Sequence, residues 1–437
     1  MMIFDKRTAA LIVLFTLPLL FFPKINLVRV GDETAGIRID DLVLLLLSGL
    51  LFWAVASINR RLSKIEWTVL AITGWSLLSF FSNLILAKAG ILEVHARIFY
   101  SVRLLEYFMF FYVGAFVFPF ISLRFIFYTF FALNACVMTL QKLGIIGGFS
   151  VYGYVIDTSR IMGIASFPSE MGLILNILFA AAIFDESYKE FFQTRVSKST
   201  YHLLASMYPY ALFLIFSILC IWTANRISLL ALVALLLAKT YRQVLSLAFH
   251  YRISFAVVAV SLALFTTYSY TQSQDFHHRS NKLASTRNFA AVNESWNRID
   301  LTTSPMGQEE NELAEEFDMS LWMRLYKWAY AAQIYLKHPE CYLQGIGPGF
   351  NTAALDGGYL RILTETGLVG LFLYGSLFLL IFKQDDQLKW MIVAAGINMI
   401  TFDVYLAYKP MSLLFLSSGY FYAKQHYSKP VEPSCAS

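Results

Sequence analysis

The stretch from Gly345 to Phe372, GIGPGFNTAALDGGYLRILTETGLVGLF, gathers residues that could do chemistry directly before an apolar helix. Its turn, GIGPGF, is rich in glycine and contains a proline. The backbone N–H groups around Gly345 and Gly347 can therefore approach an anionic or hydroxylated ligand. Asp356 follows at a natural N-cap position, where a carboxylate either caps the helix or acts on a substrate. This stretch is the candidate site.

Helical periodicity places several of these residues on one face of the helix. That face carries Asp356, Tyr359, Gly367 and Gly370. The two glycines would let it pack closely against a neighbouring span. Glu365 points the other way. We therefore interpret Glu365 as structural and Asp356 as the carboxylate that would act on a substrate.

Several arginines are a second group of residues that could bind a ligand. Six arginines map near one predicted surface: Arg97, Arg103, Arg160, Arg226, Arg324 and Arg361. The clearest case is Arg226, because WTANRISLLALVALLLA places it between two apolar segments with almost no loop. A guanidinium held at a membrane boundary suits a phosphate or pyrophosphate. For any single arginine the alternative is snorkelling, a role in topology, or a pair with a carboxylate such as Glu106.

Histidine and cysteine give weaker signals. His338, in KHPECYLQG, ends an amphipathic helix, where a cation favoured by the helix dipole is preferred over a pH-sensitive ligand. His95, His277 and His278 have no partner that the sequence identifies. The four cysteines lack the spacing of a metal site, and the sequence contains no P-loop or catalytic triad pattern. We expect neither a metal nor a cofactor.

The composition is that of a membrane protein. The 437 residues are 58% hydrophobic and 14% charged, with a mean hydropathy of +0.58. Long apolar runs without alternating polarity exclude a membrane β-barrel and predict an all-α polytopic bundle. The run from Thr8 to Phe22 has no cleavage site after it, so it is predicted to be the first span. A net charge of +5 is poor support for nucleic-acid binding.

Apolar segments predict about 12 spans. They lie at 8–22, 41–57, 65–87, 104–120, 123–140, 171–184, 207–223, 228–238, 253–268, 358–382, 390–407 and 411–423. Alternate connections are basic, which places both termini in the cytoplasm. The predicted organisation is spans 1–9 in 1–270, a large outer loop in 271–355, spans 10–12 in 356–423, and a tail in 424–437. Within the loop, SLWMRLYKWAYAAQIYLKHP predicts an amphipathic helix on the outer membrane face.

Taken in order, these residues resemble the O-antigen polymerase and ligase superfamily, the membrane glycosyltransferases of Wzy and WaaL type. The C-terminal part of the resemblance rests on Arg324, Trp328, His338, Pro339, Gly345, Gly347, Asp356, Tyr359, Leu360, Glu365 and the segment from Gly367 to Leu371. The earlier part rests on Arg38 to Leu42, Arg160 to Gly163, Pro168, Asn225 and Arg226. Ligases of the family carry a histidine where this chain has Asp356, which favours a repeat-unit polymerase.

The resemblance implies glycosyl transfer at the periplasmic face of a bacterial inner membrane, without metal or nucleotide sugar. The donor would be a glycan on undecaprenyl pyrophosphate, and the acceptor an incoming lipid-linked repeat unit. The implied partners are these lipid-linked oligosaccharides, membrane lipids and a chain-length-determining co-polymerase, with no nucleic acid. The alternatives are an O-antigen ligase and, more remotely, a flippase for lipid-linked oligosaccharides.

The resemblance also implies roles for individual residues. The catalytic set would be Asp356, Arg226 and Arg324. Pyrophosphate and glycan would be bound by Arg160, Arg103, His338, Gly345, Gly347, Tyr359 and Arg361. Residues with a structural role near the site would be Glu365, Gly367 and Gly370.

Overall fold

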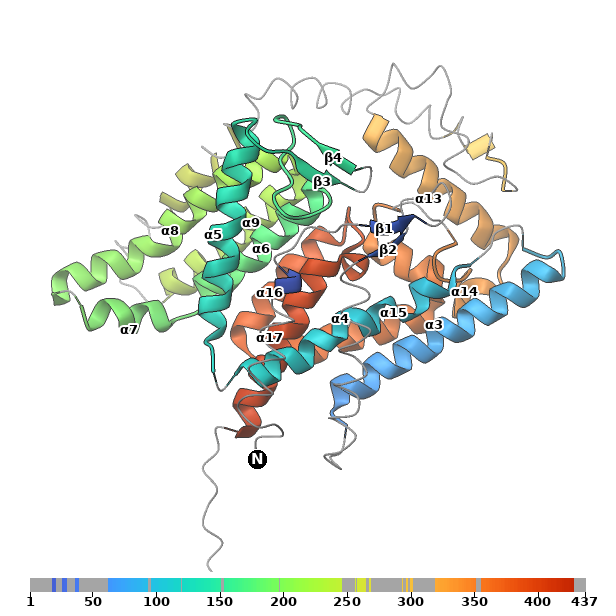
Figure 1. Cartoon of the computed structure of the whole chain (residues 1–437), viewed down its shortest axis with the longest axis horizontal. Coiled ribbons are helices and arrows are strands. Elements are labelled where there is room, and N and C mark those ends of the chain that lie inside the picture. The colour runs from blue at the N-terminus through green and yellow to red at the C-terminus, as the bar shows by residue number, and fades with distance from the viewer. Residues whose placement is uncertain are drawn as a thin grey trace, which may run out of the picture.

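The computed structural model describes residues 62–92, 96–118, 120–150, 153–195, 197–245, 319–350 and 355–427, with short pieces elsewhere. Its helices (Figure 1) are α3 (Lys64–Lys88), α4 (Ile98–Val117), α5 (Leu123–Lys142), α6 (Pro168–Phe184), α7 (Ser187–Gln193), α8 (Lys198–Thr223), α9 (Arg226–Leu245), α13 (Met319–Lys337), α14 (Cys341–Gln344), α15 (Gly358–Phe382), α16 (Asp386–Asn398) and α17 (Tyr408–Tyr427), with a 3₁₀ turn η3 (Val404–Leu406). Two antiparallel hairpins pair β1 (Asn26–Arg29) with β2 (Gly36–Arg38) and β3 (Gly148–Ser150) with β4 (Gly153–Val155).

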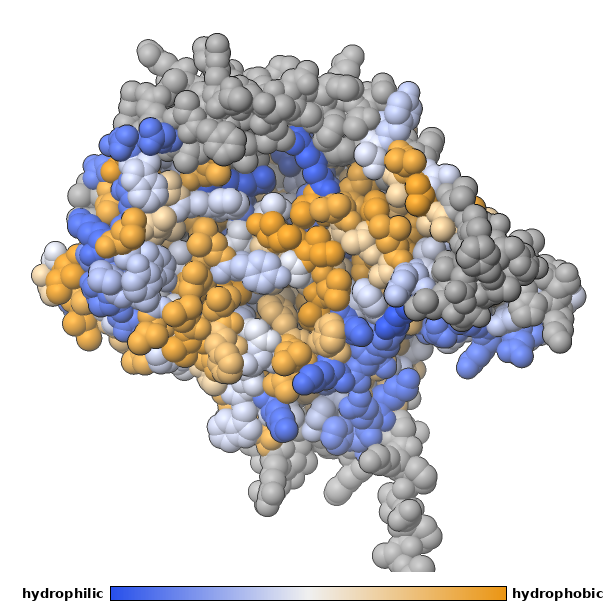
Figure 2. Space-filling model, turned by 180° about the vertical axis from the view of Figure 1, so that it is seen from behind, coloured by the Kyte–Doolittle hydropathy of each residue, from blue (hydrophilic) through white to orange (hydrophobic). Residues whose placement is uncertain are grey.

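The predicted helical class is confirmed, apart from the two small hairpins. In the described part, α3, α4, α5 and α15 are long and apolar enough to cross a membrane, and α6 and the Met207–Thr223 part of α8 are shorter apolar helices. Apolar side chains cover much of the middle of the face shown in Figure 2. These helices support a multi-pass membrane protein. The predicted spans 8–22 and 41–57 lie wholly or largely outside the described residues, and part of 253–268 also lies outside them.

The helix α6 is at the centre of one half of the molecule. Nearly all of its side chains are buried, and it contacts α5, α8, α9, α16 and α17. A helix that is apolar on every side must be surrounded by other helices. The other half contains α3, α4, α13, α14 and α15, and Figure 1 shows α16 and α17 between the two groups.

Short polar residues start several of these helices. Ser63 caps α3 in a reciprocal arrangement: its hydroxyl accepts from the N–H of Glu66, and the Glu66 carboxylate accepts from the N–H of Ser63. Glu66 also accepts a hydrogen bond of 2.7 Å from the hydroxyl of Tyr112 in α4. One acidic residue therefore both starts α3 and attaches it to its neighbour.

The helices α4 and α17 pack with their backbones in close contact. A Cβ added at Gly114 of α4 would lie 2.9 Å from the backbone nitrogen of Tyr420, and one added at Gly419 of α17 would lie 3.0 Å from the Cα of Phe111. Glycine is required wherever two membrane helices approach this closely.

Two predicted elements differ from the structure. The segment predicted as a span at 390–407 leaves the helix after Asn398 and continues as an irregular segment containing η3. The predicted amphipathic helix is present as α13. However, Ala331 and Tyr335, two residues of its apolar side, are buried, and Tyr335 packs with Ile346 and Phe350 of the glycine-rich turn. Part of this face is therefore bound to the protein itself.

Candidate active site

The helix α15 is interrupted at Gly367, and this break shapes the site. Gly367 has φ 68° and ψ −169°, a combination that is essentially restricted to glycine. Four consecutive carbonyl groups before the break, those of residues 363–366, accept hydrogen bonds from other elements. Their donors are the Tyr335 hydroxyl, the N–H groups of Ile346 and Gly347, the Ser79 hydroxyl and the Trp75 indole. Since unpaired carbonyls are costly in a membrane, these donors make the break possible.

The glycine-rich turn supplies two of these donors. The N–H of Ile346 donates to Thr364 at 2.7 Å, and the N–H of Gly347 donates to Glu365 at 3.2 Å. Gly345 and Gly367 lie back to back, since a Cβ on Gly367 would come 2.6 Å from the nitrogen of Gly345. The expectation that the turn offers its N–H groups to a ligand is therefore wrong for these donors, because the turn uses them to hold the broken helix.

Further groups of the turn are also bonded within the protein. The N–H of Gly345 donates to Cys341 at 2.7 Å, and that of Gly349 donates to the carboxylate of Glu365 at 3.1 Å. Among the carbonyls, that of Ile346 accepts from the Asn83 amide at 2.6 Å. Hydrogen bonds to several elements therefore hold the turn against the broken helix.

A buried ionic cluster connects the first turns of α15 with the segment around η3. The guanidinium of Arg361 donates from Nε to Glu365 and from a terminal nitrogen to Asp403, at 2.8 Å in both cases. Its side chain is 3% exposed. Glu365 also accepts from the hydroxyl of Tyr405 at 2.7 Å. A buried guanidinium with two carboxylates stabilises local structure, so the predicted role of Arg361 in binding substrate is not supported. The structural interpretation of Glu365 agrees with these contacts.

Asp403 connects this cluster to Asp356. Its carboxylate accepts from the N–H of Leu355 at 3.0 Å and from the N–H of Gly357 at 3.2 Å. The two bonds therefore bracket Asp356 on both sides. The carbonyl of Leu355 is held in turn by the indole of Trp328 at 3.0 Å.

This bracket holds Asp356 in a strained backbone conformation. Its φ of 55° lies in the left-handed region, which is unfavourable for residues other than glycine. The N-cap of α15 is Gly357, and no side chain caps the helix. The interpretation of Asp356 as an N-cap is therefore wrong, since its side chain points to a different partner.

That partner is Arg324 of α13. The Nε of Arg324 lies 3.3 Å from a carboxylate oxygen of Asp356, and each side chain is about 30% exposed. Burial raises the pKa of Asp356 above its ordinary value, although Arg324 lowers it; the charge of Asp403 raises it further and that of Lys327 lowers it. A partly buried carboxylate in this position can accept a proton, and the guanidinium beside it can supply positive charge to an anionic ligand.

The end of α16 contacts both the start of α15, next to Asp356, and the start of α9. Arg226 is the first residue of α9. The hydroxyl of Ser228 lies 2.8 Å from the amide oxygen of Asn398. The next residue, Met399, accepts a hydrogen bond of 2.8 Å from the N–H of Gly358, at the start of α15. The starts of α9 and α15, and with them Arg226 and the candidate carboxylate, therefore belong to one region.

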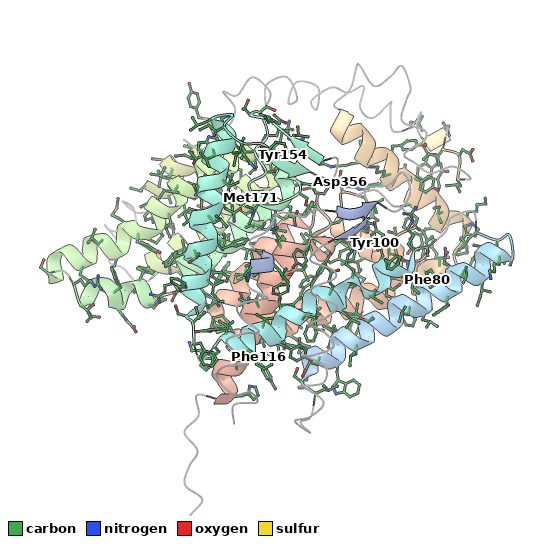
Figure 3. The ribbon with its side chains drawn as sticks, in the orientation of Figure 1. Phe80, Tyr100, Phe116, Tyr154, Met171 and Asp356 are labelled. Atoms are coloured by element: carbon green, nitrogen blue, oxygen red, sulfur yellow. The ribbon has the colours of Figure 1, made fainter. Side chains whose placement is uncertain are left out.

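The loop that carries Arg160 reaches the same region. The N–H of Ile161 donates to the carbonyl of Trp222 at 2.9 Å, so Arg160 lies next to the turn that leads into Arg226. Figure 3 shows Asp356 in the central part of the molecule, at the end where Figure 1 places α13 and the β3–β4 hairpin. Two predicted arginines and the predicted carboxylate are thus brought to one end of the bundle.

Other predicted residues have internal partners. Tyr359 is 46% exposed and donates its hydroxyl to the carbonyl of Gly396 at 2.9 Å. His338 is buried directly after the end of α13, with Nδ1 3.1 Å from Glu340. Arg103 stacks 4.8 Å over the ring of Tyr100. Gly370 is buried, and a Cβ added there would first meet the side chain of Thr366 of its own helix.

Sequence reasoning missed Asp403, Tyr405 and Lys327. A signal for Asp403 was present, because it is a carboxylate inside the segment predicted as a span, and an ionisable residue there needs a buried partner. His95, His277 and His278 lie outside the described residues. Among the residues that the structure does describe, no cluster of His, Cys, Asp and Glu could hold a metal ion.

Comparison with known proteins does not assign the chain to a family. No protein-family model matches the chain, and no curated protein matches it either.

Proposed function

We propose that this chain is a membrane glycosyltransferase of the repeat-unit polymerase type. It would transfer a growing glycan from undecaprenyl pyrophosphate to a lipid-linked repeat unit at the periplasmic face of a bacterial inner membrane. The observation that carries the proposal is Asp356, strained and partly buried beside Arg324 at the start of an apolar helix. The resemblance in the order of sequence motifs supports the same class.

The proposed chemistry is an inverting displacement at the anomeric carbon of the donor sugar. The acceptor hydroxyl forms the new glycosidic bond, the bond to the pyrophosphate oxygen breaks, and undecaprenyl pyrophosphate leaves. The hydroxyl proton passes to Asp356. Because pyrophosphate is a good leaving group, a weak base is sufficient.

The arginines would stabilise the charge on the leaving pyrophosphate. Arg226 and Arg160 lie in the same region as Asp356, and Arg324 is in contact with it. Guanidinium groups fixed before the reaction act more strongly than groups that must reorganise during it. Arg361 contributes by holding the backbone of the site, through Asp403.

The test is the surface glycan of a strain in which this gene is deleted, separated by chain length on a lipopolysaccharide gel. We expect core that carries a single repeat unit, because ligation persists while polymerisation is lost. Bare core with accumulating lipid-linked polymer would identify an O-antigen ligase instead. An unchanged ladder would contradict both assignments.

Point variants in the same strain test the site. Asp356→Ala and Arg226→Ala should each abolish chain growth while folded protein remains in the membrane. The matched control is Arg242→Ala, which removes an exposed pair with Asp386 at the other end of α9 and should leave the ladder unchanged. A normal ladder from either site variant would remove that residue from the proposed site.

A further inference from the structure

We propose that Asp403 is a positioning residue that holds Asp356 in its reactive orientation by accepting the two amide groups on either side of it. The reactive role of Asp356 rests on the proposed function, whereas the geometry of the bracket does not. The inference concerns a residue in the irregular segment after α16, far from Asp356 in the sequence.

The bracket uses both oxygens of one carboxylate. One oxygen accepts from the N–H of Gly357, and the other accepts from the N–H of Leu355 and from Arg361. The carbonyl of Leu355 is bound by Trp328, and the N–H of Gly358 by the carbonyl of Met399. The peptide groups around Asp356 are therefore fixed from three different elements.

The carboxylate of Asp403 is buried and oriented for this task. Its side chain is 6% exposed, and the buried guanidinium of Arg361 lies 2.8 Å away. An asparagine at this position has one acceptor oxygen in place of two, and its amide nitrogen would face a donor. It therefore cannot accept from both amides that flank Asp356.

Release of the bracket has a predictable result. A non-glycine residue at positive φ persists only where its surroundings hold it there. Without Asp403 the backbone at Asp356 relaxes toward ordinary φ values, and the carboxylate loses its fixed orientation. A catalytic group displaced by about 1 Å loses roughly 100-fold in rate.

The same change alters the titration of Asp356. The groups that face this carboxylate are Arg324 and Lys327 on α13 and Asp403 before η3, with Arg361 of α15 bound to Asp403. Removal of the negative charge at Asp403 leaves Arg324 and Lys327 as the charged groups that face Asp356. The pKa of Asp356 should therefore fall.

The experiment uses the full chain in native membranes and does not depend on knowing the substrate. Dicyclohexylcarbodiimide modifies protonated carboxyl groups, so its incorporation at Asp356, followed by mass spectrometry over a pH series, reports the midpoint of titration. Asp403→Asn should move this midpoint to lower pH, and Asp403→Glu should largely restore it. Glu340→Gln, which removes the exposed partner of His338, is the control and should leave it unchanged.

Chain growth from lipid-linked repeat units is measured on the same membranes. We expect a loss of roughly 100-fold for Asp403→Asn per folded molecule, with partial recovery for Asp403→Glu. A midpoint and a rate per folded molecule that are both unchanged in Asp403→Asn would overturn the inference. If the midpoint shifts but wild-type membranes show no chain growth, the proposed function fails and the coupling of Asp403 to Asp356 stands.

Discussion

Substitution of Gly367 by alanine tests how the break in α15 is maintained. The backbone of Gly367 lies in a region that costs other residues about 1–3 kcal/mol. An added Cβ would also collide with the carbonyl of Leu343 and the nitrogen of Gly345. Both are backbone atoms, and the N–H of Gly345 is held by its hydrogen bond to Cys341, so overpacking adds about 1–3 kcal/mol. Together, Gly367→Ala should lower the free energy of unfolding by about 2–6 kcal/mol.

The matched control is Gly375→Ala in the same helix. Gly375 has no atom within 4 Å of an added Cβ, so alanine there should be neutral or should stabilise by about 0.5–1 kcal/mol. The measurement is unfolding of both purified variants in mixed micelles of lipid and SDS. Equal stabilities, within about 1 kcal/mol, would refute the view that a glycine-only backbone and a close turn define this site.

Further variants test the other interactions. Arg361→Met should lower the free energy of unfolding by about 3–5 kcal/mol, because it leaves Glu365 and Asp403 buried without their cation; Arg361→Lys should cost less. Asp356→Gly should abolish chain growth but unfold within about 1 kcal/mol of wild type, since relief of backbone strain offsets the lost ion pair. Because the pKa of Asp356 is raised in the folded protein, the free energy of unfolding of the wild type should fall as the pH rises from the ordinary pKa of aspartate through the raised one. Asp356→Asn should lack that pH dependence.

Much of the helical framework could be predicted from apolar runs alone. The segments at 65–87, 123–140 and 358–382 correspond closely to α3, α5 and α15, because a span needs about 20 apolar residues. The pairing of Arg324 with Asp356 brought together two residues that the sequence had singled out. The amphipathic helix α13, which carries Arg324, was also predicted as a helix.

The parts that could not be predicted depend on tertiary contacts. Helical periodicity placed Gly367 on a regular face, but only the surrounding donors reveal that the helix breaks there. Asp403 was predicted to lie within the span at 390–407, because nothing in the local sequence indicates that it accepts N–H groups from residues far earlier in the chain. Periodicity reports which face of an element is apolar, and it carries no information on which distant group meets a carboxylate.

The break in α15 has a consequence for the order in which the membrane protein is assembled. A helix with uncovered carbonyls in its interior inserts poorly into lipid on its own. Every donor that covers them comes from α3, α13 or the glycine-rich turn, and all of these are synthesised before α15. When α15 leaves the ribosome, its partners are already present. A circular permutation that moved α3 behind α15 would remove that advantage during biosynthesis while leaving the final contacts unchanged.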